Sequence, residues 1–164
     1  MTELWLNLGC GQQVHGRSKR LKREGVELVN HDRRLHSPHV DVAHDLRQFP
    51  WPWEDESFDG IEAFDIVEHL PDTLVFMDEC WRILRPGGEI IIHTNNAAIP
   101  ASAWRDPTHI QAFTIESFDF FDPDTIWGTH YGQWYTDRNW RLVKRQHDVT
   151  ELLFVLRKRV EEHG

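Results

Sequence analysis

The feature that most constrains this chain is an apolar run over residues 4–8 that leads directly into Gly9-Cys10-Gly11. A second apolar segment follows it and ends at Asp32. Glycines suit a tight turn in which the backbone approaches a ligand, because no Cβ stands in the way. A carboxylate can accept hydrogen bonds from both hydroxyls of a ribose. The pattern therefore predicts a strand, a glycine turn and a second strand that together bind an adenosine-bearing cofactor.

The length of 164 residues predicts a single domain, residues 1–164, with a substantial core. The two cysteines, Cys10 and Cys80, match no metal-ligand or redox spacing, which favours a reducing, cytoplasmic setting. No apolar run approaches the ~18–20 residues of a membrane helix, and the first residues lack a signal-peptide pattern. We therefore expect a cytoplasmic protein with no membrane partner.

The formal net charge of −9 argues against general nucleic-acid affinity, which depends on neutralising phosphates. Basic residues nevertheless crowd one stretch of the chain, either as a solvated face or as a site for an anionic substrate or partner. They are Arg17, Lys19, Arg20, Lys22, Arg23, Arg33 and Arg34.

Apolar patterning predicts five mostly parallel strands followed by an antiparallel hairpin. The expected strands cover residues 3–8, 26–31, 40–44, 60–64 and 89–93, and the hairpin covers residues 140–146 and 150–156. Between them, residues 95–113 are expected to be irregular. Thr114 is expected to cap a short helix that ends near Phe121.

One longer helix is predicted between the fourth and fifth strands. Asp72 is expected to cap it, and it should run to about Leu84 before Pro86 and the following glycines end it. Its expected buried stripe consists of Leu74, Met77, Trp81 and Leu84.

Taken together, short motifs over roughly residues 4–94 resemble those of class I S-adenosylmethionine-dependent methyltransferases of the small, type 11-like group. The motifs are residues 6–11, Asn30-His31-Asp32, His44-Asp45-Leu46, Ser57-Phe58-Asp59, Glu68-His69-Leu70-Pro71 and residues 82–88. The resemblance implies an α/β fold with a Rossmann-like, mostly parallel sheet. The implied strand order is 3-2-1-4-5-7-6, with strand 7 antiparallel.

The resemblance also implies a binding site for S-adenosyl-L-methionine. The glycine turn would face the methionyl part, Asp32 would hold the ribose, and Asp45 would take the adenine amino group with Leu46 against the ring. Backbone after the fourth strand would lie beside the cofactor. The implied residues are Gly9, Cys10, Gly11, Asp32, Asp45, Leu46, Phe64 and Asp65.

A dinucleotide cofactor is disfavoured by the same residues. It would need a third glycine opening a helix whose N-terminus receives a pyrophosphate. Here Gln12-Gln13-Val14 follows the turn, the next glycine is Gly16, and residues 17–24 carry almost no apolar stripe.

The chain departs from the family in its crossovers. The segment that connects the first and second strands is polar, and the next connection, residues 33–39, is too short for a helix. The second, third and fourth strands alternate between apolar and polar residues instead of being apolar throughout. A parallel sheet covered on both faces should not alternate. We therefore expect reduced helical cover on one sheet face, which tolerates water or is covered by a second copy or a partner subunit.

Methyl transfer needs an aligned nucleophile, and for a hydroxyl or amine it also needs a base. The resemblance places such groups after strands 4 and 5, where His69 and the long segment 95–113 lie. His69 and His109 are the candidate catalytic residues, since imidazole titrates near neutrality. His109 is equally compatible with a purely structural role. An aromatic wall over a substrate is a further option, and packing of the hairpin onto the sheet is an equally favoured role for the same residues, which are Trp104, Trp127, Tyr131, Trp134 and Tyr135.

Metal use is left open by the sequence. Asp65, Glu68 and His69 would share one face of a helix, and some methyltransferases hold a divalent ion with a similar group. His93 or His109 would then supply a fourth ligand. The same Glu-His-Leu-Pro segment also occurs in relatives without metal, where it shapes a turn.

The main hypothesis is therefore an S-adenosylmethionine-dependent methyltransferase acting on a small-molecule or glycan- or lipid-like acceptor, with oxygen the favoured atom. A cofactor-binding, non-catalytic subunit that supports a partner enzyme is the alternative, and an NAD- or nucleotide-dependent enzyme ranks below it. The sequence does not identify the acceptor.

Overall fold

The described part of the chain, residues 2–12, 15–16 and 24–160 of a computed structural model, is built on one seven-stranded sheet. The sheet order is β3-β2-β1-β4-β5-β7-β6, as the sequence predicts. The strands are β1 (Glu3–Leu8), β2 (Val26–Asp32), β3 (Val42–Ala43), β4 (Phe58–Phe64), β5 (Leu84–Asn95), β6 (Trp140–His147) and β7 (Glu151–Lys158). Strands β1 to β5 pair in parallel, and β7 runs antiparallel to both β5 and β6.

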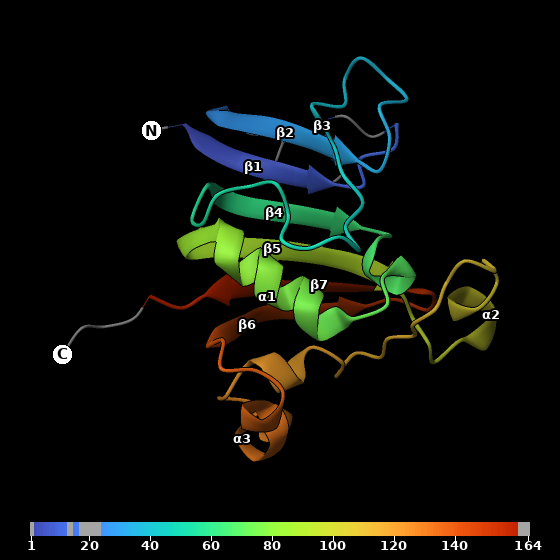
Figure 1. The fold of residues 1–164 in the computed structure, drawn as a ribbon. Helices are drawn as coiled ribbons and strands as arrows, with labels where there is room; N and C mark the ends of the chain where they lie inside the picture. Colours follow the sequence, from blue (N-terminus) through green and yellow to red (C-terminus); the bar gives the residue numbers. More distant parts are fainter. Residues whose placement is uncertain (1, 13–14, 17–23, 161–164) are drawn as a thin grey trace.

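The register of the central strands depends on a close contact between β1 and β4. Trp5 is paired with Gly60, and a Cβ on Gly60 would lie 2.4 Å from the Trp5 indole. The indole therefore occupies the space above the glycine. This packing fixes β1 beside β4 and brings the carboxyl ends of both strands to the same edge of the sheet (Figure 1).

Helix α1 (Thr73–Ile83) lies across one face of the sheet (Figure 1). Its N-cap is Asp72, as predicted, and the carboxylate accepts hydrogen bonds from the backbone N–H groups of Leu74 and Val75. The predicted buried stripe is only partly right, because Leu74 is 38% exposed. The helical residues that are fully buried are Phe76, Met77, Cys80 and Ile83.

Three element boundaries differ from the sequence prediction. Strand β5 begins at Leu84 instead of residue 89, because Leu84 pairs with Phe58 and the predicted turn at residues 85–88 lies within the strand, beside a register shift. Strand β3 is reduced to two residues. Thr114 caps no helix, since its segment forms a turn with Ser117, and only the short helix η3 (Asp119–Phe121) follows.

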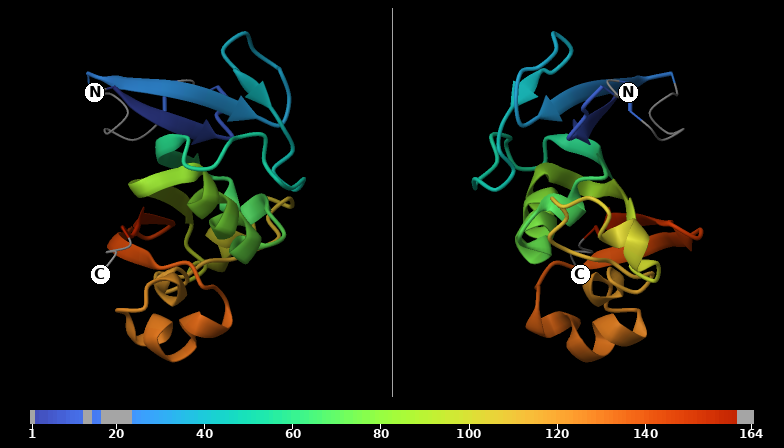
Figure 2. Two further views of the ribbon diagram at one scale, coloured as in Figure 1. Left: turned by 60° about the vertical axis from the view of Figure 1, so that its left-hand side comes forward. Right: turned by 90° about the vertical axis from the view of Figure 1, so that its right-hand side faces the viewer.

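The remaining helices are short and lie away from the sheet centre. Helix η2 (Val67–His69) follows β4, α2 (Pro100–Ala103) lies beyond the strand ends, and α3 (Ile126–Tyr131) and η4 (Gly132–Trp134) lie near β6 (Figures 1 and 2). Within the described residues, no α-helix crosses the sheet face opposite α1 (Figure 2). No helix in this part of the chain has the length and apolar character needed to cross a membrane.

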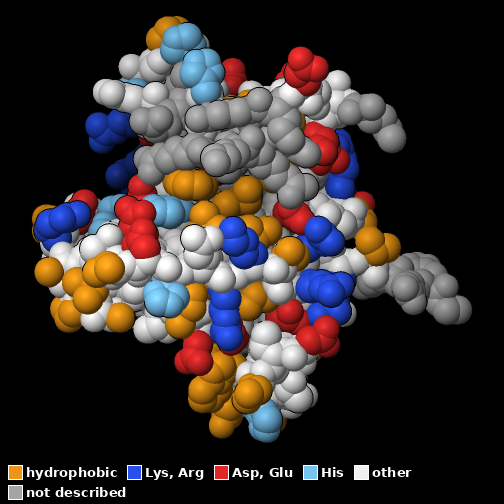
Figure 3. All heavy atoms as spheres, turned by 180° about the vertical axis from the view of Figure 1, so that it is seen from behind, with side chains coloured by type: hydrophobic (Ala, Val, Ile, Leu, Met, Phe, Trp, Pro, Cys, Tyr) orange, Lys and Arg blue, Asp and Glu red, His pale blue; other side chains and the backbone are white. Residues whose placement is uncertain are grey.

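The hydrophobic core is unequal on the two faces. The large cluster lies between the sheet and α1, and it includes Leu6, Ile61, Ile90 and Phe154, all completely buried. The opposite face carries a small cluster of Trp5 and Ile91, with partly buried apolar residues around it. Viewed from behind, this face shows apolar side chains among charged ones (Figure 3). The predicted reduction of helical cover therefore agrees with the described structure.

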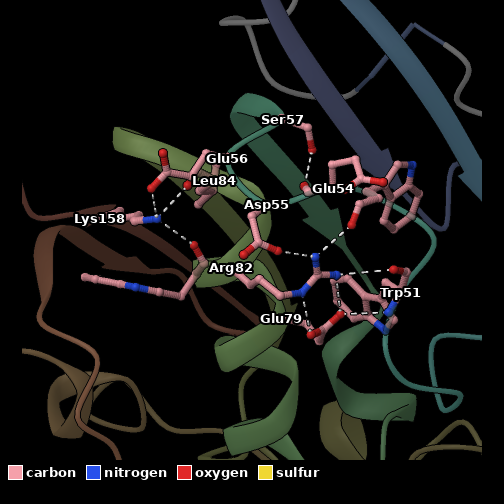
Figure 4. A network of polar contacts seen from close by, with 11 residues as sticks. Trp51, Glu54, Asp55, Glu56, Ser57, Glu79, Arg82, Leu84 and Lys158 are labelled. Atoms are coloured by element: carbon pink, nitrogen blue, oxygen red, sulfur yellow. Dashed lines mark hydrogen bonds and ion pairs between the residues drawn. The ribbon is translucent and has the colours of Figure 1, made fainter.

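A polar network fastens the segment before β4 to α1 (Figure 4). The Arg82 guanidinium donates hydrogen bonds to the carbonyl oxygens of Trp51 and Trp53 and to the carboxylates of Asp55 and Glu79. The Trp51 indole N–H in turn donates to the carbonyl oxygen of Leu46. The network thus supports the wall of a cavity at the sheet edge.

Candidate active site

The glycine turn lies at the carboxyl edge of the sheet and adopts backbone conformations that favour glycine. Gly9 and Gly11 have φ angles of +63° and +53°. A Cβ on Gly9 would lie 2.0 Å from Cδ1 of Ile66, so a side chain there would also collide with the segment after β4. The turn is tied to β2, since the Cys10 N–H donates to the carbonyl oxygen of His31 at 2.8 Å. Burial raises the pKa of the Cys10 thiol to about 11, so this cysteine stays protonated.

Asp32, at the end of β2, is the acid that the turn faces. Its carboxylate accepts hydrogen bonds from the N–H groups of Gly11 at 2.9 Å and Arg33 at 2.7 Å. A carboxylate has about four acceptor positions, so two remain for a ligand. His31 supports the turn from below: its Nε2 donates to the carbonyl oxygen of His44, and its Nδ1 faces the Gly9 N–H at 3.4 Å. Burial lowers the pKa of His31, so the ring is neutral.

Asp45 and Leu46 lie on the far side of the same cavity. The Asp45 carboxylate is paired with the guanidinium of Arg47, and with that of Arg33 at 3.3 Å, and these contacts hold the pKa of Asp45 below its ordinary value. Leu46 is buried. The cavity, here called the glycine-turn pocket, has a volume of about 740 Å³. Its lining includes Gly9, His31, Asp32, Asp45, Leu46, Ile66 and His69.

Phe64 and Asp65, whose backbone is expected beside the cofactor, turn their side chains away from the glycine-turn pocket. Phe64 stacks on the His93 ring and packs with the small cluster on the face opposite α1, so its side chain points away from the pocket. Asp65 has a φ of +56° and holds Nδ1 of His93 at 3.0 Å, while Glu151 holds Nε2 at 3.1 Å. The hydrogen bond that the ring donates to Asp65, followed by the one that it donates to Glu151, raises the pKa of His93. Both ring nitrogens of His93 are therefore hydrogen-bonded to carboxylates.

A second cavity adjoins the first at His69. This acidic chamber has a volume of about 570 Å³. It is lined by Asp65, Glu68, His69, Asn95, Ser102, Arg105, Asp106, Pro107, His109 and Glu151. The segment that carries His109 is anchored to η2, because the N–H groups of Ile110 and Gln111 donate to the carbonyl oxygen of Glu68.

Both candidate catalytic histidines line the acidic chamber, and their rings lie edge to face with centroids 4.7 Å apart. Glu68 is buried beside them, which raises its pKa. One potential ligand atom from each of these three residues lies within 4.8 Å of the others. A carboxylate and two imidazoles suit a divalent transition metal. Of the ligands the sequence suggests, His109 fits such a set, whereas His93 is already paired with Asp65 and Glu151.

The aromatic residues considered for a substrate wall do not line either cavity. Trp127 and Tyr131 stack on each other and on Phe120, within α3 and its neighbours. Trp134 and Trp104 are largely exposed. Of the basic stretch, Arg33 contributes to the glycine-turn pocket, while Arg17, Lys19, Arg20, Lys22 and Arg23 lie outside the described residues.

Several residues that complete the site carry no motif in the sequence. Ile66, Arg47, Asn95 and Glu151 reach the cavities from loops or strand ends. The strand-end position of Asn95 and Glu151 is the only signal that points to them, since residues at the carboxyl edge of a parallel sheet surround its ligand.

Residues 6–92 match the family described as "Methyltransferase domain". A probable S-adenosylmethionine-dependent methyltransferase of Mycolicibacterium smegmatis is 42% identical over 64 residues, which are 38% of this chain and 24% of that protein. The ubiquinone biosynthesis O-methyltransferase of Xylella fastidiosa is 28% identical over 113 residues, covering 58% of this chain and 43% of that protein. The chain thus spans less than half the length of these relatives.

Solved structures share the fold at low sequence identity. A SAM-dependent methyltransferase from Archaeoglobus fulgidus superposes with a TM-score of 0.64 at 16% identity, covering 96% of this chain and 86% of that one. A methyltransferase chain in a complex with the Trm112 activator of Haloferax volcanii gives a TM-score of 0.66 at 11% identity, covering 96% and 83%.

Proposed function

Because this chain belongs to the class I S-adenosylmethionine-dependent methyltransferases, we propose that it transfers a methyl group to a hydroxyl oxygen of a small-molecule or glycan- or lipid-like acceptor. The observation that carries the proposal is the adjacency of two cavities at the carboxyl edge of the sheet, joined at His69. The names of the ubiquinone biosynthesis relatives favour oxygen as the methylated atom.

The glycine-turn pocket suits the cofactor. Its volume of about 740 Å³ falls in the range of roughly 300–1,000 Å³ that is typical of small-molecule sites. Asp32 keeps two acceptor positions for ribose hydroxyls, and buried Leu46 offers an apolar surface beside Asp45 for a flat ring. The position at which a pyrophosphate-binding turn carries its third glycine is Val14, and the next glycine, Gly16, comes two residues later.

When bound, S-adenosylmethionine supplies a methyl group on a sulfonium sulfur, which a nucleophile can displace. The residues of the chain then have two tasks. Asp32 orients the ribose, and Gly9 lets the backbone approach the methionyl part. Asp45 can accept from the adenine amino group when it gives up one of its contacts with Arg47 or Arg33. His69 and His109 stand on the acceptor side, where an imidazole can take the proton of a hydroxyl and accelerate transfer by roughly 10²–10⁴-fold.

Substitution of Asp32 tests the cofactor site. Asp32→Asn keeps the shape but replaces the carboxylate that would accept the ribose hydroxyls, so we expect S-adenosylhomocysteine to bind roughly 10–100-fold more weakly by calorimetry. The control is Asp59→Asn, since Asp59 likewise accepts from a backbone N–H, that of Leu4, and pairs with an arginine, Arg85, but does not line the pocket.

Equal affinity of both variants for S-adenosylhomocysteine would contradict the proposal, as would heat from NAD but none from S-adenosylhomocysteine. A chain that binds S-adenosylhomocysteine but transfers no methyl group to any acceptor would instead favour the alternative function, a non-catalytic subunit that binds the cofactor and supports a partner enzyme.

A further inference from the structure

The acidic chamber is almost entirely polar. Nine of its ten lining residues carry an ionisable or hydrogen-bonding side chain, and Pro107 is the exception. The exposed aromatic residues of α3 and η4 lie outside it. An apolar or aromatic acceptor would find no apolar wall in the chamber and would desolvate its carboxylates without compensation.

In both histidines, the ring nitrogen that makes hydrogen bonds is Nδ1. Nδ1 of His109 lies 2.7 Å from the carbonyl oxygen of Ala103, which can only accept, so Nδ1 carries the hydrogen. The Thr108 hydroxyl donates to Asp106 and therefore accepts from Nδ1 of His69, as does the Thr108 carbonyl oxygen. In the neutral form of each ring Nε2 therefore carries the lone pair, and Nε2 of His109 lies 4.0 Å from Oδ2 of Asp106.

Glu68 is the buried acid beside these rings. The side chain is 1% exposed, and its Oε1 accepts a hydrogen bond from the Asn95 amide. A hydrogen bond with the Thr94 side chain also acts on this carboxyl group and lowers its pKa, against the larger effect of burial, which raises it. Glu68 and the two Nε2 atoms together present acceptor atoms at one side of the chamber.

The charges of the chamber exclude anions. Four of its lining residues are carboxylates, Asp65, Glu68, Asp106 and Glu151. The lining includes one arginine, Arg105. The His93 ring is a second basic group nearby, and its two nitrogens donate to the carboxylates of Asp65 and Glu151. An acceptor with a carboxylate or a phosphate would face like charges in this space.

We infer that the acidic chamber binds a hydroxyl-rich acceptor of the sugar or polyol class that carries no anionic group. This inference rests on the proposed methyl transfer and narrows its substrate class. Hydroxyl groups donate to Glu68, Asp106 and Glu151, and the reacting hydroxyl donates to Nε2 of His109. Its oxygen forms the new bond to the methyl carbon, the carbon–sulfur bond breaks with its electron pair kept by sulfur, and the proton passes to Nε2.

The experiment compares three probes on the full chain saturated with S-adenosylhomocysteine. Methyl glucoside, glucuronate and catechol are titrated while the imidazole resonances of His69 and His109 are followed by NMR, and His69→Gln and His109→Gln assign the signals. We expect methyl glucoside to shift both histidines with an apparent affinity roughly tenfold above that of glucuronate or catechol.

Charge-neutralising variants supply the second readout. In Asp106→Asn and Glu151→Gln, the discrimination between methyl glucoside and glucuronate should shrink by roughly threefold or more, since one repulsive carboxylate is gone. Glu116→Gln, an exposed glutamate outside the chamber, should leave the discrimination unchanged.

Three results would overturn the inference: equal or stronger shifts with catechol, equal or stronger shifts with glucuronate, or no shift with methyl glucoside. Stoichiometric Zn²⁺ that shifts both histidines and is not displaced by methyl glucoside would also overturn it, because the three acceptors would then serve a metal. A chain that fails to bind S-adenosylhomocysteine at all would refute the proposed function itself.

Discussion

Gly9 is the residue whose replacement should separate backbone strain from cofactor binding. Its φ of +63° and the 2.0 Å approach of a Cβ to Ile66 both oppose a side chain. We expect Gly9→Ala to lower the free energy of unfolding by about 1–3 kcal/mol and to weaken S-adenosylhomocysteine binding, because the turn and the segment after β4 must move apart. Urea unfolding and calorimetry measure the two effects.

Gly25→Ala is the matched control for that substitution. Gly25 also has a positive φ, +79°, but a Cβ there would meet nothing within 4 Å, and it does not line the glycine-turn pocket. Gly25→Ala should lower the free energy of unfolding through backbone strain and leave the affinity for S-adenosylhomocysteine unchanged. If Gly9→Ala binds S-adenosylhomocysteine as tightly as Gly25→Ala does, the turn does not contact the cofactor.

His31 makes stability depend on pH. Burial lowers its pKa in the folded chain, whereas the unfolded chain takes up a proton near pH 6.5. Below about pH 6.5, the unfolded chain therefore binds more protons than the folded chain at His31. The contribution of neutral His31 to the free energy of unfolding is lost as the pH falls through this range. We expect the stability of His31→Gln, measured by urea unfolding, to fall less than that of the unsubstituted chain between pH 7.5 and 5.5.

The comparison with His31→Gln is needed because other groups change the free energy of unfolding with pH in the opposite direction. The pKa values of His93 and Glu68 are raised, so their contributions weaken as the pH rises, and they do so equally in both proteins. Parallel pH profiles for the two proteins would show that His31 is not the group responsible.

At the scale of residues, motifs located pocket-lining side chains where the position of the residue along its strand decides which cavity it meets. Asp32 and Asp45 end strands or follow them, and both line the glycine-turn pocket. Phe64 also ends a strand, but alternation turns its side chain to the opposite face of the sheet, where it meets His93. The pairing of His93 with Glu151 joins positions 58 residues apart, and no local pattern announces it.

At the scale of elements, local signals predicted the presence of strands and helices better than their ends. The Asp72 cap is correct because capping involves only neighbouring backbone N–H groups. The start of β5 differs from the prediction because Leu84 pairs with Phe58 on β4, and the residues predicted as a turn, with Gly87 at a φ of +82°, lie at a register shift inside the strand. Of the short helix predicted after Thr114, only η3 forms, and Phe118 before it packs against Phe113 and Phe154 in the core.

The junction between α1 and the segment before β4 depends on Arg82 (Figure 4). Its guanidinium makes hydrogen bonds to two carbonyl oxygens and two carboxylates, whereas a lysine has three donors on one nitrogen. We expect Arg82→Lys to lower the free energy of unfolding by about 2–3 kcal/mol. Thermal or urea unfolding measures this loss.

Arg85→Lys is the control, since Arg85 pairs with Asp59 on the surface and is 44% exposed. Such a pair contributes about 0–1 kcal/mol. Equal losses for the two variants would mean that the Arg82 network does not stabilise the junction. A much weaker S-adenosylhomocysteine affinity in Arg82→Lys would show that the junction also holds Trp51 and Leu46 against the pocket.

At the scale of the whole molecule, the sequence located the edge of the sheet where the cavities lie but not their chemistry. Parallel strands bring their carboxyl ends together, so the pocket at that edge follows from strand order alone. The acidic character of the second cavity comes from Asp65 after β4, Glu68 on η2, Asp106 in the segment 105–109 and Glu151 on β7. Those segments meet only in the folded chain, so the charge of the cavity could not be predicted from the sequence.

The sheet face opposite α1 is where the whole molecule should meet another chain. In the described structure this face has no helix across it and a small cluster, Trp5 and Ile91, edged by partly buried Leu28 and Val155. We expect a homodimer through this face, visible as a doubled mass in light scattering as the concentration rises. Leu28→Glu should then restore the monomer by placing a charge in the interface. Leu74→Glu, on the exposed side of α1, should leave the dimer intact, and a single monomer mass at high concentration would contradict the expectation.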